Sequence, residues 1–231
     1  MAEARVAAVI DGDTLELEDG RRVRLAGIEA PKPSPDDGAG GPHADAATAA
    51  LRDMTLGRTV RFDRKAAADR HGRLLTQLTR DDGLWIQEGL LARGHARVHT
   101  RPDARDRASE LLAAEARART AGLGLWRDRA FAIRPADPDM LRRDRDSFQI
   151  LEGQVLKAAK VRGGVYLNFG ADWKTDVTVH IARAALRGFT KAGLDPLAYE
   201  GQRIRVRGWV GRRNGPLIEV THPEQIEWIG E

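Results

Sequence analysis

The order of secondary-structure patterns in the last third of the chain strongly limits the folds open to it. Between residues 148 and 221, apolar and polar positions alternate in a way that predicts three strands, a helix within 182–193, and two further strands. Asn214–Gly215 between the last two strands is a typical two-residue hairpin turn. Strand, strand, strand, helix, strand, strand is the order of an OB barrel, a small sheet of five strands.

The first part of the chain has a related pattern with more helix. Residues 5–28 alternate as a meander of short strands. Ala and Leu at helical spacing then predict a helix at 43–57, and further helices are expected at 84–94 and 103–122, the last with Asp103 as its N-cap. The two halves of the chain are at most two versions of one barrel, and the fold class is mainly β with α (α+β).

A segment poor in apolar periodicity separates the two patterns. Residues 129–147 contain two prolines and dense mixed charge, which is typical of a linker. The expected domains are therefore 1–128, a linker at 129–147, and a second, smaller barrel at 148–231. A chain of 231 residues is long enough for two such domains, each with its own core.

Composition excludes some classes of protein. The absence of cysteine excludes disulfides and thiolate catalysis. Residues 148–231 hold 12 Lys and Arg against 9 Asp and Glu, a mild excess that suits a polyanionic partner but also an ordinary soluble protein. No apolar run approaches the roughly 18 residues of a membrane span, and the start of the chain lacks the pattern of a signal peptide. The sequence leaves the location open: the periplasm or the exterior if a leader has been removed, and otherwise the cytoplasm.

Short motifs in the N-terminal part contain the residue types of a phosphate site. In VIDGDT, Asp11 and Asp13 flank a glycine where a strand breaks, and carboxylate oxygens are the ligands that Ca²⁺ and Mg²⁺ prefer. Asp-Gly is also a common turn dipeptide, so a plain hairpin loop explains this motif equally simply. Strand alternation places Arg24 opposite the core face, and Arg73 follows a glycine whose turn can aim its guanidinium inward.

These motifs become specific when they are taken together. In order and spacing, VIDGDTLEL, RVRLAGIEAP, DRHGRLL, WIQEGLLARGHARV and GLGLW resemble the thermonuclease family, the staphylococcal nuclease-like domains, over residues 5–127. The resemblance implies a five-stranded OB barrel with three helices that cleaves DNA and RNA with Ca²⁺, while Mg²⁺ and Mn²⁺ stay open as alternatives. It also implies that Asp13 and Glu29 bind the metal and that Arg24 and Arg73 hold the scissile phosphate.

The chain departs from the family pattern at Lys32. The family has a glutamate there that acts on the attacking water, and an ammonium group cannot accept a proton in the same way. Three explanations are open: Asp36 or Asp37 of the following loop replaces the missing carboxylate, Lys32 binds the phosphate as an extra catalytic cation, or the site only binds phosphate. A solvated loop lysine without a role is a fourth. Glu29 also replaces the more usual aspartate.

The C-terminal part has its own candidate surface for nucleic acid. In QRIRVRGWVGRR, alternation places four side chains on the face opposite the apolar residues: Arg203, Arg205, Arg207 and Trp209. Cations for the backbone and a ring for stacking are what a groove for single-stranded nucleic acid uses, and Tyr166 is expected to join them. The alternative is that these side chains simply cover a small barrel. The region loosely resembles an OB module appended to some bacterial nucleases.

The leading hypothesis from the sequence is a metal-dependent hydrolase of the thermonuclease type. Its substrate would be DNA or RNA, single-stranded, and cleavage would be slow because Lys32 replaces the usual glutamate. The alternative is a catalytically impaired nucleic-acid-binding protein on a nuclease fold. A third hypothesis, a protein-interaction scaffold, predicts no salt-dependent affinity for oligonucleotides. The sequence leaves the oligomeric state open.

Overall fold

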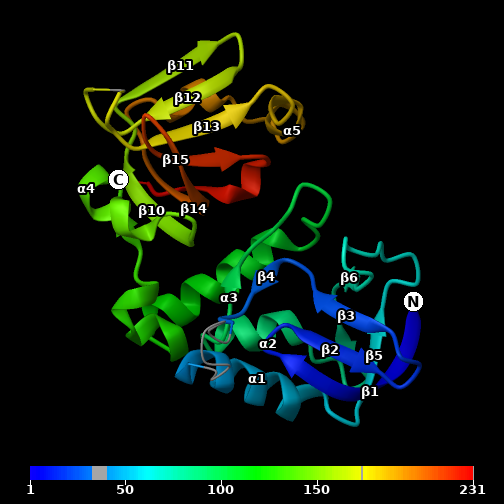
Figure 1. Cartoon of the computed structure of the whole chain (residues 1–231). Helices are drawn as coiled ribbons and strands as arrows, with labels where there is room; N and C mark the ends of the chain where they lie inside the picture. Colours follow the sequence, from blue (N-terminus) through cyan, green and yellow to red (C-terminus); the bar gives the residue numbers. More distant parts are fainter. Residues whose placement is uncertain (33–40, 173, 231) are drawn as a thin grey trace. The chain divides into compact units, whose positions relative to one another are not determined.

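The computed structural model describes residues 1–32, 41–172 and 174–230, and it divides into two compact units. The units are Met1–Ala130 and Phe131–Glu231, and the colours of Figure 1 follow the chain through both. Each unit has its own core of buried apolar side chains. Among the described residues, no helix is long and apolar enough to cross a membrane.

A six-stranded sheet forms the first unit, in the order β6-β3-β2-β1-β5-β7. The pair β3–β6 is parallel and the other neighbours are antiparallel. Because only two residues separate β6 from β7, the two ends of this path form one nearly continuous strand, and the sheet closes into a barrel. The strands are β1 (Ala2–Asp11), β2 (Thr14–Leu17), β3 (Arg22–Leu25), β5 (Thr59–Phe62), β6 (Leu74–Thr76) and β7 (Thr79–Arg80).

Three α-helices accompany this barrel, as predicted. α1 packs on β1, and α2 packs on α3. α1 and α2 each end two residues before a glycine, Gly57 and Gly94, whose positive φ angles of 68° and 70° suit a residue without a side chain. The elements are α1 (Pro42–Thr55), α2 (Ile86–Ala92), α3 (Ala108–Thr120), the short pair β4 (Ile28–Glu29) and β8 (Arg97–Val98), and the 3-10 turns η1 (Gly124–Arg127) and η2 (Arg129–Phe131).

The start of α3 differs from the prediction. The helix begins at Ala108, after Arg107 in the left-handed region with a φ of 59°, whereas Asp103 was expected to be its cap. Asp103 instead forms an ion pair with Arg101. The Asp-rich segment before the helix is therefore a turn rather than the first turn of the helix.

The second unit repeats the barrel path of the first. Its sheet order is β11-β12-β13-β15-β14-β10-β9, and β13–β15 is the parallel pair that corresponds to β3–β6 of the first unit. Only Val155 and Leu156 separate β10 from β11; Val155 N–H donates to Gln202 beside β14 and Leu156 N–H donates to Asn168 of β12, so the path closes through one interrupted strand. The elements are β10 (Phe148–Gln154), β11 (Lys157–Val161), β12 (Gly164–Asn168), β13 (Thr178–Ala182), α5 (Leu186–Lys191), η4 (Pro196–Tyr199), β14 (Arg203–Arg213), β15 (Gly215–Val220), η5 (Pro223–Gln225) and β16 (Ile226–Trp228).

The segment expected as a linker is mostly folded, so that expectation needs correction. It contains β9 (Arg134–Pro135), which pairs in parallel with β10, then α4 (Pro138–Leu141) and η3 (Arg142–Asp144). Leu141 is fully buried in the core of the second unit. The Asp and Pro residues that suggested a break between the domains instead begin the helix α4. The side chain of Asp137 caps it by accepting from the backbone N–H groups of Asp139 and Met140.

Candidate active site

Asp13 is the second residue of the turn between β1 and β2, in a position that the preceding glycine makes possible. A Cβ added at Gly12 would lie 2.6 Å from the Cβ of Ala47 and 2.8 Å from that of Ala30. The turn therefore packs directly on α1, and the Asp13 side chain is 0% exposed. Its Oδ2 accepts a hydrogen bond of 2.7 Å from the backbone N–H of Ala30, and its Oδ1 accepts one of 3.2 Å from the hydroxyl of Thr14.

Arg24 of β3 joins this carboxylate to Glu29. Its Nη1 contacts Asp13 Oδ1, and its Nη2 lies 2.5 Å from Glu29 Oε2. Burial lowers the pKa of the Arg24 guanidinium, although the carboxylates of Glu29 and Asp11 oppose the effect. Burial acts to raise the pKa of Glu29, but the hydrogen bond with His99 and the charge of Arg24 outweigh it and hold that pKa below its usual range. The site thus holds a charged arginine against two carboxylates, largely away from solvent.

Lys32 lies between two carboxylates. Its Nζ is 3.0 Å from Asp11 Oδ2 and also contacts Asp13 Oδ1, while 38% of the side chain is exposed. Burial and the charge of Arg24 lower the pKa of Lys32, against the opposing effect of Asp11 and Glu29. Asp36 and Asp37, the loop carboxylates proposed as substitutes for the missing glutamate, lie outside the described residues.

Arg73 is held by a carboxylate that the sequence reasoning missed. Asp69 Oδ2 lies 2.8 Å from Arg73 Nε and 2.7 Å from its Nη2, across the turn at Gly72 that precedes β6. Burial acts to raise the pKa of Asp69, but the hydrogen bonds from Arg73 and His71 lower it to about 2. The signal was present in the motif DRHGR, whose Asp and Arg are four residues apart on either side of a glycine turn.

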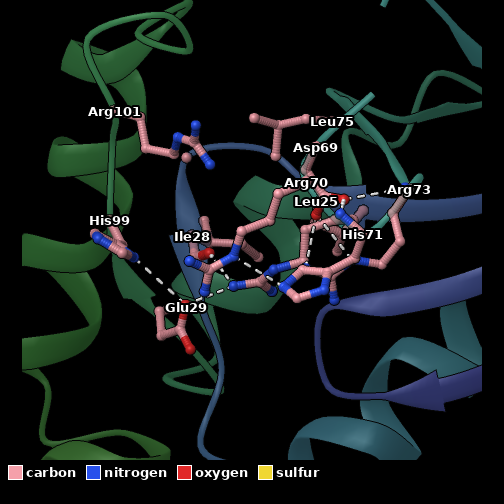
Figure 2. A pocket seen from close by; sticks show the side chains of 12 residues that line it. Leu25, Ile28, Glu29, Asp69, Arg70, His71, Arg73, Leu75, His99 and Arg101 are labelled. Carbon is pink, nitrogen blue, oxygen red and sulfur yellow. Dashed lines mark hydrogen bonds and ion pairs between the residues drawn. The ribbon is translucent and has the colours of Figure 1, made fainter. Parts of the chain in front are cut away.

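The side chains of Arg24 and Arg73 line one pocket. Four arginines and two histidines there face two carboxylates, so the pocket is suited to an anion. Figure 2 shows the contacts of Glu29 with His99 and of Asp69 with Arg73 at this pocket. The charged and titratable lining residues are Arg24, Glu29, Asp69, Arg70, His71, Arg73, His99 and Arg101.

The arginines of β14 do not form the exposed row that alternation predicted. Arg207 is 1% exposed and pairs with Glu227, and Arg205 contacts Glu152 at 2.7 Å and Glu227 at 3.5 Å. The prediction that Arg205 and Arg207 face solvent is therefore wrong. Strands on both sides of β14 supply the glutamates, since Arg205 lies opposite Glu152 of β10 and Glu227 of β16. Trp209 is exposed and meets Phe148 edge to face.

Tyr166 lines a groove of the second barrel that Arg205, Arg207 and Trp209 do not line. Its ring stacks on His180 at a centroid distance of 4.3 Å, and its hydroxyl accepts a 3.1 Å hydrogen bond from Arg213. Lys157 and Asn168 line the same groove. The structure therefore separates Tyr166 from the strand residues with which it was expected to act.

A closed barrel with three helices, and with an arginine-lined pocket beside acidic residues, defines an OB domain of the α+β class. Residues 22–128 match the family model of staphylococcal nuclease homologues. Two proteins of Escherichia coli, one from strain O157:H7, each described as an uncharacterized endonuclease, are 34% identical to this chain over 130 residues. The matched part covers 54% of this chain and 76% of each relative. The chain belongs to the staphylococcal nuclease homologue family.

Proposed function

We propose that the N-terminal barrel is a nuclease that hydrolyses phosphodiester bonds of DNA and RNA. The observation that carries the proposal is the pair Arg24 and Arg73, which line one cationic pocket: Arg24 lies in β3, and Arg73 comes directly before β6, the parallel neighbour of β3. In hydrolysis, a water oxygen bonds to phosphorus, one ester P–O bond breaks, and the leaving oxygen gains a proton. Guanidinium groups held in place stabilise the charge that grows on the phosphoryl oxygens.

The family generally uses Ca²⁺, and Asp13 and Glu29 are the carboxylates that would hold it. In this fold both are already engaged by cations: Asp13 by Arg24 and Lys32, and Glu29 by Arg24. Ca²⁺ takes six to eight oxygen ligands, yet within the described residues no three His, Asp or Glu side chains gather around one point. The donor set does not fit a divalent ion while Lys32 lies on it, so no step of the reaction is derived through a metal.

We also propose that the second barrel binds single-stranded nucleic acid in the groove at Tyr166. The groove combines an aromatic ring with Lys157 and Arg213, and its lining residues include no carboxylate. Ring stacking and backbone cations are the two contributions on which binding without base preference depends. A strand held there would be tethered to the same chain as the nuclease pocket, which raises its local concentration.

A nucleic-acid-binding protein with a decayed nuclease site is the second candidate function. The position of Lys32 supports it, because an ammonium group that pairs with Asp11 and Asp13 stands where the family has its glutamate. Such a protein would retain the cationic pocket and the groove but would not cleave the phosphodiester bond at an enzymatic rate. The two candidates differ in whether purified protein cleaves labelled oligonucleotides.

The deciding experiment compares the purified wild-type chain with Asp13→Ala and Arg73→Ala on labelled single-stranded DNA and RNA. Arg61→Ala is the control, since Arg61 is a half-buried barrel arginine that pairs with Glu3 and does not line the pocket. Cleavage lost in the first two variants and retained in the control establishes the nuclease. Wild-type cleavage equal to the Asp13→Ala background, with salt-sensitive binding intact, would instead establish the binding protein.

A further inference from the structure

The charge balance of the site changes in a specific way because a lysine stands at position 32. Three carboxylates, Asp11, Asp13 and Glu29, are in ion-pair contact with two cations, Arg24 and Lys32, which leaves a formal charge of −1. With the family's glutamate at position 32, four carboxylates would face Arg24 alone, for a charge of −3. A divalent ion would return that value to −1. The replacement of glutamate by lysine therefore changes the charge of the site by the same two units as a divalent metal would.

The ammonium group also occupies the place that the metal would need. It contacts the carboxylates of both Asp11 and Asp13, and Asp13 is fully buried, so a cation is required to balance its charge. The remaining oxygen of Asp13 accepts from the backbone of Ala30. A divalent ion could bind Asp13 only after Lys32 had left two ion pairs.

We propose that the Lys32 ammonium replaces the divalent metal of this family, so that the site works without one. The inference rests on the proposed nuclease function and names the group that supplies its central positive charge. An ammonium group has three N–H donors, and among the described residues two of them are used, by Asp11 and Asp13. The third is available to a non-bridging oxygen of the scissile phosphate. Lys32 stays protonated through the reaction, and the two protons of the attacking water end on the product phosphate and the leaving oxygen or in solvent.

The test measures cleavage of labelled single-stranded DNA by the full chain in EDTA and in millimolar Ca²⁺ or Mg²⁺. Lys32→Met removes the charge and keeps much of the side-chain length, and Lys32→Glu restores the family pattern. Lys191→Glu, at an exposed position of α5, makes the same change in net charge on the other unit and is the matched control. Calorimetric titration with Ca²⁺ provides a readout that does not depend on activity, and melting temperatures show whether each variant folds.

We expect wild-type and Lys191→Glu proteins to cleave equally in EDTA and in Ca²⁺, and Lys32→Met to be slower by about 10²–10³-fold, as for loss of one preorganised donor. Lys32→Glu should be inactive in EDTA and should bind Ca²⁺ in a manner that Asp13→Asn abolishes. Wild-type cleavage that EDTA stops and Ca²⁺ restores would overturn this inference while leaving the nuclease function in place.

The two proposals fail in distinguishable ways. If neither the wild-type nor the Lys32→Glu protein cleaves under any condition, the nuclease function is wrong, and the calorimetry still decides the role of Lys32. Ca²⁺ binding by the wild-type chain that depends on Asp13 would then overturn the replacement. Ca²⁺ binding by the Lys32→Glu protein, with none by the wild-type chain, would support the replacement. If Lys32→Glu does not fold, the wild-type and Lys32→Met measurements decide alone.

Discussion

The two barrels of this chain share a strand path but use their charged residues differently. In the first barrel, Arg24 of β3 lines an open pocket that suits an anion. The corresponding strand of the second barrel is β13, and its His180 pairs with Glu219. Arg205 and Arg207 of β14, in turn, are covered by glutamates of the neighbouring strands. The same topology can therefore present cations to a ligand or use them internally, and the residues across the strand register decide which.

The largest effect that sharpens this comparison is expected at Glu227. Its carboxylate pairs with Arg207, which is almost fully buried, so Glu227→Ala removes a counter-charge from a buried guanidinium. We expect a loss of about 3–5 kcal/mol in the free energy of unfolding of the second unit, measured by urea denaturation. Arg203→Ala, which removes an exposed partner of Glu152, should cost under about 1 kcal/mol. Equal effects would show that the pairs on β14 are not structural.

The next effect concerns an arginine of the first barrel that is proposed to act on a ligand. Arg73→Ala should lower kcat by about 10²–10³-fold, because one donor to the phosphoryl oxygens is lost. Its stability should fall by under about 1 kcal/mol, since the pair with Asp69 is local and partly exposed. The contrast with Glu227→Ala is direct: one change affects rate, the other affects folding. A large stability loss with an unchanged rate would make Arg73 a structural residue like Arg207.

A smaller effect separates the two aromatic candidates of the second barrel. Tyr166→Ala should weaken binding of a single-stranded oligonucleotide by about 1–3 kcal/mol, the usual value of one stacked base, as measured by fluorescence anisotropy. Trp209→Ala is the matched change outside the groove, and we expect it to alter affinity by less than a factor of two or so. If Trp209 proves the more important ring, the binding surface lies on β14 and not at the groove.

The smallest effect is a pH dependence that belongs to the first barrel. The pKa of Asp69 is lowered to about 2 in the folded chain, so its charged form stabilises the native state. That stabilisation is fully present above about pH 4, the ordinary range of an Asp carboxyl, and is lost as the pH falls towards 2. The free energy of unfolding of Asp69→Asn should therefore lie about 1–2 kcal/mol below that of the wild type at pH 6, with the gap closing by pH 2. A constant gap would rule out this linkage.

The sequence predicted most of the strands and helices because their signals are local. Apolar alternation located the strands, and glycines with positive φ ended the helices near Gly57 and Gly94, as expected. A hairpin also forms at this position, with Asn214 at a φ of 67°, but the turn is shorter than the predicted Asn-Gly turn because Gly215 already lies in β15 opposite Arg213. The prediction of a linker at 129–147 was wrong because Asp and Pro are typical both of a loop and of a helix start. Only the packing of Leu141 in the core distinguishes the two.

What the sequence by itself determined is which residues the site contains: the motif order placed Asp13, Arg24 and Glu29 together, and it singled out Lys32 as the departure. Only the tertiary structure decided their partners. Alternation assigns a side chain to a face, but its neighbours on that face come from strands distant in sequence, through the register of the sheet. For that reason, only the folded structure shows that Lys32 pairs with the aspartates and that the buried Arg207 pairs with Glu227.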